Sequence, residues 1–192
     1  MPETGNPEDR VRSAGAAADG TSPPARMFWS GLAVAAAVLL FDQLSKWAIT
    51  GMVIDPACVT PPATQPGCAI PVLPFFNLTL VYNPGVTFGL GGGLGPLVLS
   101  GLAVAISVGL AVWLRKVDSM LLAIAIGGII GGAIGNVVDR LRFGAVVDFL
   151  DVFIPGSTLP HWPAFNLADS AIVVGVGLII VDGLIAGRAK TA

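Results

Sequence analysis

Four apolar stretches restrict the possible folds of this chain more than any other feature. They lie at about residues 27–49, 96–114, 120–138 and 167–187. Each has roughly the 20 residues that an α-helix needs to cross the hydrocarbon core of a bilayer. Only 11% of the residues are charged, against about 25% in an ordinary soluble domain. The sequence therefore predicts an all-α membrane protein with four transmembrane helices.

The distribution of Lys and Arg predicts how these helices are oriented, because cytoplasmic loops carry an excess of both. Seven basic residues would lie on one side of the membrane and three on the other. The seven are Arg10, Arg12, Arg26, Arg115, Lys116, Arg188 and Lys190, and the three are Lys46, Arg140 and Arg142. Both termini are therefore expected in the cytoplasm, and the two long loops, 50–95 and 139–166, on the outer face.

Residues 1–26 differ from the rest of the chain. They are rich in Pro, Gly, Ala and charge and show no apolar periodicity, which is typical of a disordered tail. A basic residue before an apolar run also allows a secretory signal peptide, but no small-residue cleavage site follows that run. We therefore expect a disordered cytoplasmic tail, a retained first span, and a four-helix membrane domain over residues 27–188.

The first long loop has features of β-structure. Its segment "FFNLTLVYN" (75–83) alternates polar and apolar residues, and "NPG" and "GLGGG" supply turn residues. A small β-platform on the outer, periplasmic or extracellular, surface is therefore expected. Cys58 and Cys68 lie in the same loop, where they form either a disulfide or two free thiols. Their spacing indicates no metal site.

The ionisable groups near the membrane fall in one layer at the outer ends of the helices. They are Asp42, Lys46, Asp139, Arg140, Asp148 and Asp169. Proton and ion pathways usually need polar groups across the whole membrane, so a single layer favours a site that works at the interface. The competing hypothesis is a non-enzymatic transporter or scaffold, in which the same residues are ion pairs and helix caps.

Several of these residues have a structural interpretation. Asp42 and Lys46 are four apart with the acid first, the favoured arrangement of a helical ion pair. Asn136 and Arg140 are also four apart and could satisfy the carbonyl groups at the end of the third helix. The glycines of "GGIIGGAIG" (127–135) are expected to be close-packing positions between helices.

Asp148 is harder to explain structurally. It lies between Val147 and Phe149, without a capping pattern or a basic residue at helical spacing, and an unpaired carboxylate in apolar surroundings is costly. Asp169, in contrast, fits a capping box with Asn166. Two carboxyl groups held together at low dielectric share a proton, and such a pair can activate water for hydrolysis. No HExxH or GxSxG motif offers another mechanism.

Four stretches together resemble the motifs of lipoprotein signal peptidase, also called signal peptidase II. They are "FDQLSKW" (41–47), "YNPGVTFG" (82–89), "GGAIGNVVDRLRFGAVVDF" (131–149) and "FNLADS" (165–170). The resemblance implies an aspartic endopeptidase of the bacterial inner membrane. Such an enzyme removes the signal peptide from diacylglyceryl-modified prolipoproteins, with water as the nucleophile and without metal or cofactor. Its expected partners are this substrate and membrane lipid, without nucleic acid, and we expect a monomer.

The resemblance also implies roles for single residues. It places the catalytic pair on Asp148 and Asp169. It gives polar support to Asp139, Arg140, Asn136 and Asn166, and it matches the family's first two motifs at Asp42, Lys46, Asn83 and Gly85. It further implies a β-platform within the 50–95 loop and a short outer helix at about residues 150–163, which together would clasp the substrate.

Overall fold

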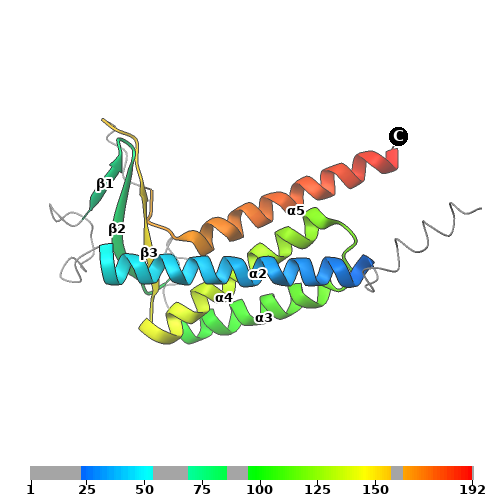
Figure 1. The fold of residues 1–192 in the computed structure, drawn as a ribbon, viewed down its shortest axis with the longest axis horizontal. Helices are drawn as coiled ribbons and strands as arrows, with labels where there is room; N and C mark the ends of the chain where they lie inside the picture. The colour runs from blue at the N-terminus through cyan, green and yellow to red at the C-terminus, as the bar shows by residue number, and fades with distance from the viewer. Residues whose placement is uncertain (1–22, 54–68, 86–94, 157–161, 192) are drawn as a thin grey trace, which may run out of the picture.

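The structure, a computed structural model, describes residues 23–53, 69–85, 95–156 and 162–191 (Figure 1). Its elements are, in order, α2 (Pro23–Ala48), the π-helical turn η1 (Ile49–Val53), β1 (Ile70–Leu73), β2 (Phe76–Asn83), α3 (Pro96–Leu114), α4 (Met120–Phe143), β3 (Val146–Val152) and α5 (Leu167–Thr191). Both cysteines and residues 1–22 lie outside the described residues, so the predictions made for them are not tested.

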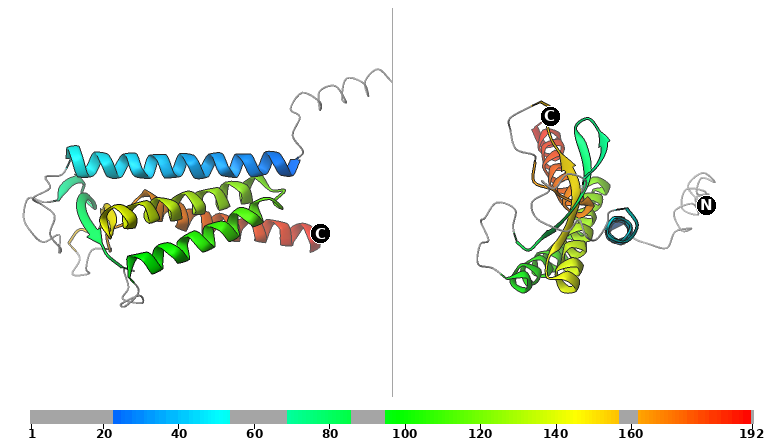
Figure 2. Two further views of the ribbon diagram at one scale, coloured as in Figure 1. Left: turned by 90° about the horizontal axis from the view of Figure 1, so that it is seen from below. Right: turned by 90° about the vertical axis from the view of Figure 1, so that its left-hand side faces the viewer.

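The described helices form a bundle in which α4 is central. This helix packs against α2, α3 and α5 (Figure 2). All four are long and apolar enough to cross a membrane, which confirms the predicted number of transmembrane helices. Large apolar side chains such as Leu97, Val173 and Leu184 are exposed on the outside of the bundle, as expected of surfaces that face lipid rather than water.

Glycines in α4 explain how closely its neighbours approach. A Cβ atom added to them would collide with the backbone of the facing helix. The collisions are of Gly127 with the Gly31 carbonyl oxygen, of Gly131 with the Ala35 carbonyl oxygen, and of Gly132 with the Ala168 carbonyl oxygen. Small residues four apart let two backbones pack in direct contact, which stabilises helix pairs in lipid. The interpretation of "GGIIGGAIG" as packing positions is confirmed.

A three-stranded antiparallel sheet, in the order β1-β2-β3, lies across one end of the bundle (Figure 1). Val147 and Phe149 are buried in a cluster with Leu80 and Ile49. Successive side chains of a strand point to opposite faces, so Asp148 points away from this cluster. The predicted combination of four membrane helices and a small sheet is confirmed, but the third strand comes from the second outer loop, where no strand was predicted.

The second outer loop also differs from the prediction at both of its ends. Helix α4 continues to Phe143, five residues past the predicted end, and stops at Gly144, which has a φ of 70°. Residues 139–143 are therefore helical rather than part of a loop. The described part of 150–163 holds the end of β3 and irregular backbone, and no helix occurs in it. Helix α2 begins at Pro23, four residues before the predicted span.

Candidate active site

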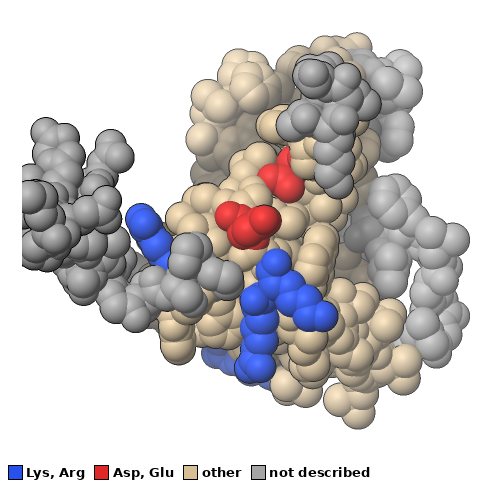
Figure 3. Space-filling view, turned by 90° about the vertical axis from the view of Figure 1, so that its right-hand side faces the viewer, with Lys and Arg blue, Asp and Glu red and all other residues tan. Residues whose placement is uncertain are grey.

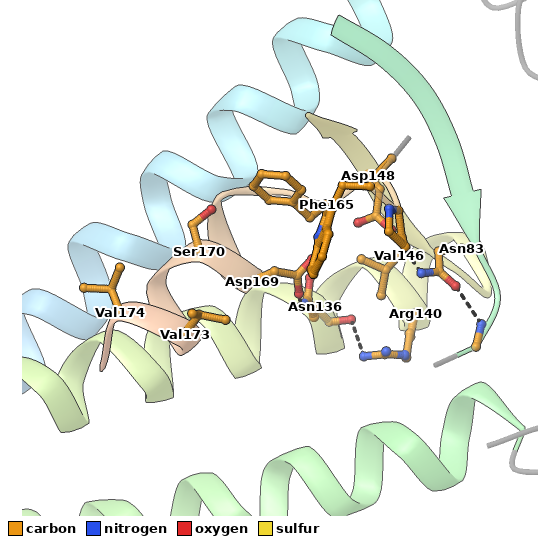
Figure 4. A pocket seen from close by; sticks show the side chains of 14 residues that line it. Asn83, Asn136, Arg140, Val146, Asp148, Phe165, Asp169, Ser170, Val173 and Val174 are labelled. Atoms are coloured by element: carbon orange, nitrogen blue, oxygen red, sulfur yellow. Dashed lines mark hydrogen bonds between the residues drawn. The ribbon is translucent and has the colours of Figure 1, made fainter. Parts of the chain in front are cut away.

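A cavity of about 560 Å³ opens at the sheet end of the bundle, between β3, α4 and the start of α5 (Figure 4). Its polar lining residues are Asn83, Asn136, Arg140, Asp148, Asp169 and Ser170. Much of the remaining wall is apolar and continues along α5 through Val173 and Val174, both of which are exposed on the outside of the bundle. The cavity thus joins a polar end to a lipid-facing surface.

The two aspartates that the resemblance singles out reach this cavity from different elements. Asp148 projects from β3 and is only 2% exposed. Asp169 lies in the first turn of α5, where its backbone N–H donates to Asn166 Oδ1 at 2.9 Å and its Oδ2 accepts from the Asn166 N–H at 3.3 Å. The predicted capping box is therefore present. Capping the helix does not remove Asp169 from the cavity, because its side chain also lines the wall.

Asparagine side chains donate to both carboxylates. Asn83 Nδ2 lies 3.1 Å from Asp148 Oδ2, and Asn166 Nδ2 lies 2.7 Å from Asp148 Oδ1. Asn136 Nδ2 donates to Asp169 Oδ1 at 2.8 Å. Each oxygen of Asp148 therefore has a fixed donor. Hydrogen bonds of this kind hold a carboxylate in one orientation and favour its charged form.

Burial nevertheless dominates the protonation of Asp148. Loss of hydration, followed by the negative charge of Asp169, raises the pKa of Asp148 from 3.8 to about 7. The amide donors Asn83 and Asn166 and the charge of Lys46 act in the opposite direction and are weaker. Near neutral pH, Asp148 therefore exchanges a proton readily, as general acid–base catalysis requires.

A buried ion cluster lies behind the cavity. Lys46 Nζ is 2.8 Å from Asp42 Oδ2 and 2.7 Å from Asp139 Oδ2, and all three side chains are almost fully buried. Asp42 Oδ1 accepts the backbone N–H of Ala168 on α5 at 3.0 Å, and Asp139 Oδ2 accepts that of Val147 on β3 at 3.1 Å. The cluster therefore links α2 and α4 to the segments that carry both aspartates.

Three comparisons place the chain among known proteins. A family model described as signal peptidase (SPase) II matches residues 34–185. The chain belongs to the signal peptidase II family. A lipoprotein signal peptidase of Caulobacter vibrioides is 40% identical over 168 residues, which cover 86% of this chain and 92% of that protein. One of Polynucleobacter necessarius is 44% identical over 165 residues, which cover 84% and 93%.

A solved structure agrees with the fold. It is described as a bacterial membrane enzyme solved by the in meso method at 2.3 Å resolution, and it is 30% identical with a TM-score of 0.66. The match covers 83% of this chain and 90% of that one. The resemblance read from the motifs is confirmed, and this member of the signal peptidase II family is a multi-pass membrane hydrolase of the peptidase class. That result overturns the non-enzymatic hypothesis.

Arg140 lies on the last turns of α4 and lines the same cavity. Its Nη1 donates to the backbone oxygen of Asn136 at 3.4 Å. Its Nε is buried and has no hydrogen-bond partner among the described residues. The interpretation that Arg140 only satisfies carbonyl groups at the helix end accounts for Nη1, and the side chain also lines the cavity.

Gln43 is a polar residue of the site that the sequence analysis did not single out. Its Nε2 lies 2.9 Å from Asp139 Oδ1, and it also contacts Asp42 Oδ2 and the Gly135 carbonyl oxygen, each at 3.2 Å. The signal was present in the sequence, because Gln43 directly follows an acid in an otherwise apolar helix. Gly85, in contrast, was predicted, and its N–H donates to Asn83 Oδ1 at 3.2 Å.

Proposed function

We propose that this protein removes the signal peptide from diacylglyceryl-modified prolipoproteins by water attack at an aspartate pair, Asp148 and Asp169. Membership of the signal peptidase II family and the names of the relatives support the substrate. The observation that carries the mechanism is that both aspartates line one cavity, in which burial and the charge of Asp169 bring the pKa of Asp148 to about 7.

In this mechanism Asp148 carries a proton and Asp169 is ionised when substrate binds. Asp169 takes a proton from water, the water oxygen attacks the scissile carbonyl carbon, and Asp148 donates its hydrogen bond to the carbonyl oxygen. The proton that Asp169 gained then passes to the scissile nitrogen, the tetrahedral intermediate collapses with cleavage of its C–N bond, the amine leaves, and the pair returns to its starting state. The asparagine donors keep both carboxyl groups oriented throughout.

Arg140 is proposed to hold the substrate. Its planar guanidinium is suited to oxygen acceptors, and its side chain lines the cavity. A peptide or ester carbonyl oxygen of the substrate would accept a hydrogen bond from it there. Because Arg140 and both aspartates line one cavity, the same contact would bring the scissile bond within reach of the aspartate pair.

The position of the cavity suits a substrate that is anchored by lipid. Moving an acyl chain into water costs about 0.8 kcal/mol per CH₂ group, so the scissile bond has to be cut near the membrane surface. The cavity lies at the ends of the helices, and its apolar wall continues along Val173 and Val174. A diacylglyceryl group could therefore stay in the bilayer while the peptide enters the polar end.

We also propose that the protein is a monomer of the bacterial inner membrane, with both termini in the cytoplasm and the site near the outer face. Exposed Lys and Arg side chains gather at the end of the bundle away from the sheet, where Arg26, Arg115 and Lys116 are exposed (Figure 3). At the sheet end, Lys46 is buried between two acids, Arg140 is half-buried and Arg142 is exposed. The larger number of exposed basic residues at the end away from the sheet supports a cytoplasmic position for that end. The proposed domains are a tail over residues 1–26, of which residues 23–26 already form the start of α2, and the peptidase over residues 27–188.

The test is cleavage of a diacylglyceryl prolipoprotein by purified protein in lipid vesicles. Asp148→Asn and Asp169→Asn are each expected to lower kcat by about a thousandfold or more, because neither amide can exchange the catalytic proton. Asp151→Asn is the matched control. Asp151 lies on the same strand and is also buried, but it contacts Asn77 at 3.1 Å outside the cavity. Substantial turnover by a folded Asp148 or Asp169 variant would rule out the aspartate pair.

A further inference from the structure

Three asparagine amides present their NH₂ groups, rather than their oxygens, to the two aspartates. The contacts are Asn83 Nδ2 with Asp148 Oδ2, Asn166 Nδ2 with Asp148 Oδ1, and Asn136 Nδ2 with Asp169 Oδ1. An asparagine side chain carries donors at one end and an acceptor at the other. A rotation by half a turn would therefore place an oxygen against a carboxylate oxygen and replace attraction by repulsion.

Backbone groups hold two of these amides in the required orientation. Asn83 Oδ1 accepts the Gly85 N–H at 3.2 Å, and Asn166 Oδ1 accepts the Asp169 N–H at 2.9 Å. A backbone N–H is only a donor, so the oxygen of each side chain has to face it. The NH₂ group is then directed to the carboxylate on the other side.

Asn136 has no such backbone donor among its described contacts. Its Oδ1 accepts from Lys46 Nζ at 3.1 Å and from Asn166 Nδ2 at 3.2 Å. An ammonium group only donates hydrogen bonds, so the Asn136 oxygen has to face Lys46. Lys46 therefore fixes the orientation of Asn136, as backbone N–H groups fix the other two amides. The Asn166 contact is the weaker restraint, because the same Nδ2 lies closer to Asp148, at 2.7 Å.

The ammonium group of Lys46 is buried, and acceptors surround it. Its side chain is 4% exposed, and its three N–H donors match three acceptors, Asp42, Asp139 and Asn136. A single acid would neutralise the charge of the lysine, so the cluster contains more than charge balance requires. The contact with Asn136 requires an ammonium group that is held in one position, and the two acids hold it there.

We propose that Lys46 is a positioning residue for the aspartate pair, whose ammonium fixes the orientation of the Asn136 amide and so keeps a hydrogen-bond donor directed at Asp169. The inference rests on the proposed function and adds a role for a residue that does not touch the substrate cavity. Lys46 acts through Asn136 across the interface of α2 and α4. A helical ion pair with Asp42 alone would not require the Asn136 contact.

The first experiment compares Lys46→Gln with Lys46→Met in the cleavage assay. Both variants lose the charge, but only Gln keeps an N–H donor for Asn136 Oδ1. Lys46→Met is expected to lower kcat by about a hundredfold with KM changed less than about threefold, and Lys46→Gln to keep at least tenfold more kcat than Lys46→Met. Equal kcat values in the two folded variants would show that only the charge matters and would overturn the proposal.

The second experiment is a double-mutant cycle with Asn136→Ala. If Lys46 acts through Asn136, the double variant Lys46→Met/Asn136→Ala is no slower than Asn136→Ala alone. If the kcat loss of the double variant equals the product of the two single losses, the residues act independently and the proposal is overturned. Leu114→Ala is the structural control, because Leu114 is buried against Val117 and Ile126 and belongs neither to the cavity wall nor to the ion cluster. It is expected to lower the unfolding midpoint while the kcat of the folded protein stays within about threefold.

The pH profile gives a readout that a purely structural role would not move. The charged groups around the pair are Lys46 and Asp42 on α2, Asp139 and Arg140 on α4, and the two aspartates themselves. The positive charge of Lys46 lowers the pKa of Asp148. The basic limb of kcat/KM is therefore expected to move to higher pH in Lys46→Met. If the basic limb of the Lys46→Met profile does not move and its kcat equals that of wild type, Lys46 has a structural role only and the proposal is overturned.

Two outcomes of these experiments keep the failures distinguishable. If the wild-type protein does not cleave the prolipoprotein, the proposed function fails. If wild type cleaves and Lys46→Met cleaves equally well, only the positioning role fails. Should Lys46→Met not fold, the Met and Gln variants are compared in an Asp42→Asn background, where one of the two acids that face the lysine is neutral. The same ratio of kcat values is expected there, and equal values would again overturn the proposal.

Discussion

Replacing Asp148 by Asn is expected to stabilise the fold above neutral pH while it abolishes cleavage. In the folded protein, burial and the charge of Asp169 raise the pKa of this carboxyl from 3.8 to about 7. Below about pH 4 the group is protonated in both the folded and the unfolded protein, and it costs nothing. Between about pH 4 and pH 7 the unfolded chain is ionised while the folded protein still holds the proton, so stability falls as the pH rises, and the full penalty is reached once the folded group ionises as well.

The size of this effect follows from the same pKa values. Each pKa unit corresponds to about 1.4 kcal/mol, so the full penalty near pH 9 is about 4 kcal/mol. The substitution also has a cost. Asn83 and Asn166 both donate to Asp148, and an amide at this position can accept from only one of them. A buried donor that loses its partner costs about 1–3 kcal/mol. We therefore expect a net gain of about 1–3 kcal/mol at pH 9 and a net loss at pH 4.

The assay is unfolding in mixed micelles of neutral detergent and dodecyl sulfate, followed by circular dichroism from pH 4 to pH 9. The difference in unfolding free energy between Asp148→Asn and wild type should change sign within this range. Asp151→Asn, the buried neighbour on the same strand, should show no such crossing. If the difference in unfolding free energy stays constant with pH, the claim that burial raises the pKa of Asp148 in the folded protein is refuted.

Two further predictions concern the active site and the helix packing. The kcat/KM of the wild-type enzyme is expected to fall as the pH rises past about 7, because Asp148 then loses the proton that the mechanism requires; a rate that stays flat to pH 9 would contradict this. Gly131→Ala is expected to destabilise the fold by about 1–3 kcal/mol, because its Cβ would collide with the Ala35 carbonyl oxygen. Gly177→Ala, which meets nothing within 4 Å, should be near neutral by thermal unfolding, and equal effects of the two would argue against close packing.

Local spacing was enough to predict several parts of the structure. The apolar stretches were enough to predict the four helices, because the backbone hydrogen bonds of a helix all lie within its own segment. The Asp42–Lys46 pair and the Asn166–Asp169 capping box also depend on contacts within one helix or its first turn. Interactions at a separation of three or four residues are fixed by helix geometry, and a single sequence is sufficient to find them.

Contacts between distant segments were not predictable in this way. Strand β3 pairs with β2, about 70 residues earlier. The segment "VVDFLDV" has the β-branched and aromatic residues typical of a strand, but nothing in it names the partner that makes it one. Helix α4 continues past its apolar part, where Asp139 is paired with Lys46 of α2. The left-handed Gly144 that ends the helix was the local signal that was missed. The orientation of the asparagine amides depends on contacts with five elements, α2, β2, α4, β3 and α5, and no single motif contains them.

The pairing of β3 with β2 has a consequence for biogenesis. A nascent chain made as far as the end of β3 already possesses α2, α3, α4, all three strands of the described sheet and Asp148. It still lacks α5, which brings Asp169, together with Asn166 just before it. Under the proposed mechanism, competence to cut peptide bonds is acquired only when the C-terminal helix enters the bilayer. A product truncated before that point would be an inert membrane protein, with no partly active protease released into the lipid.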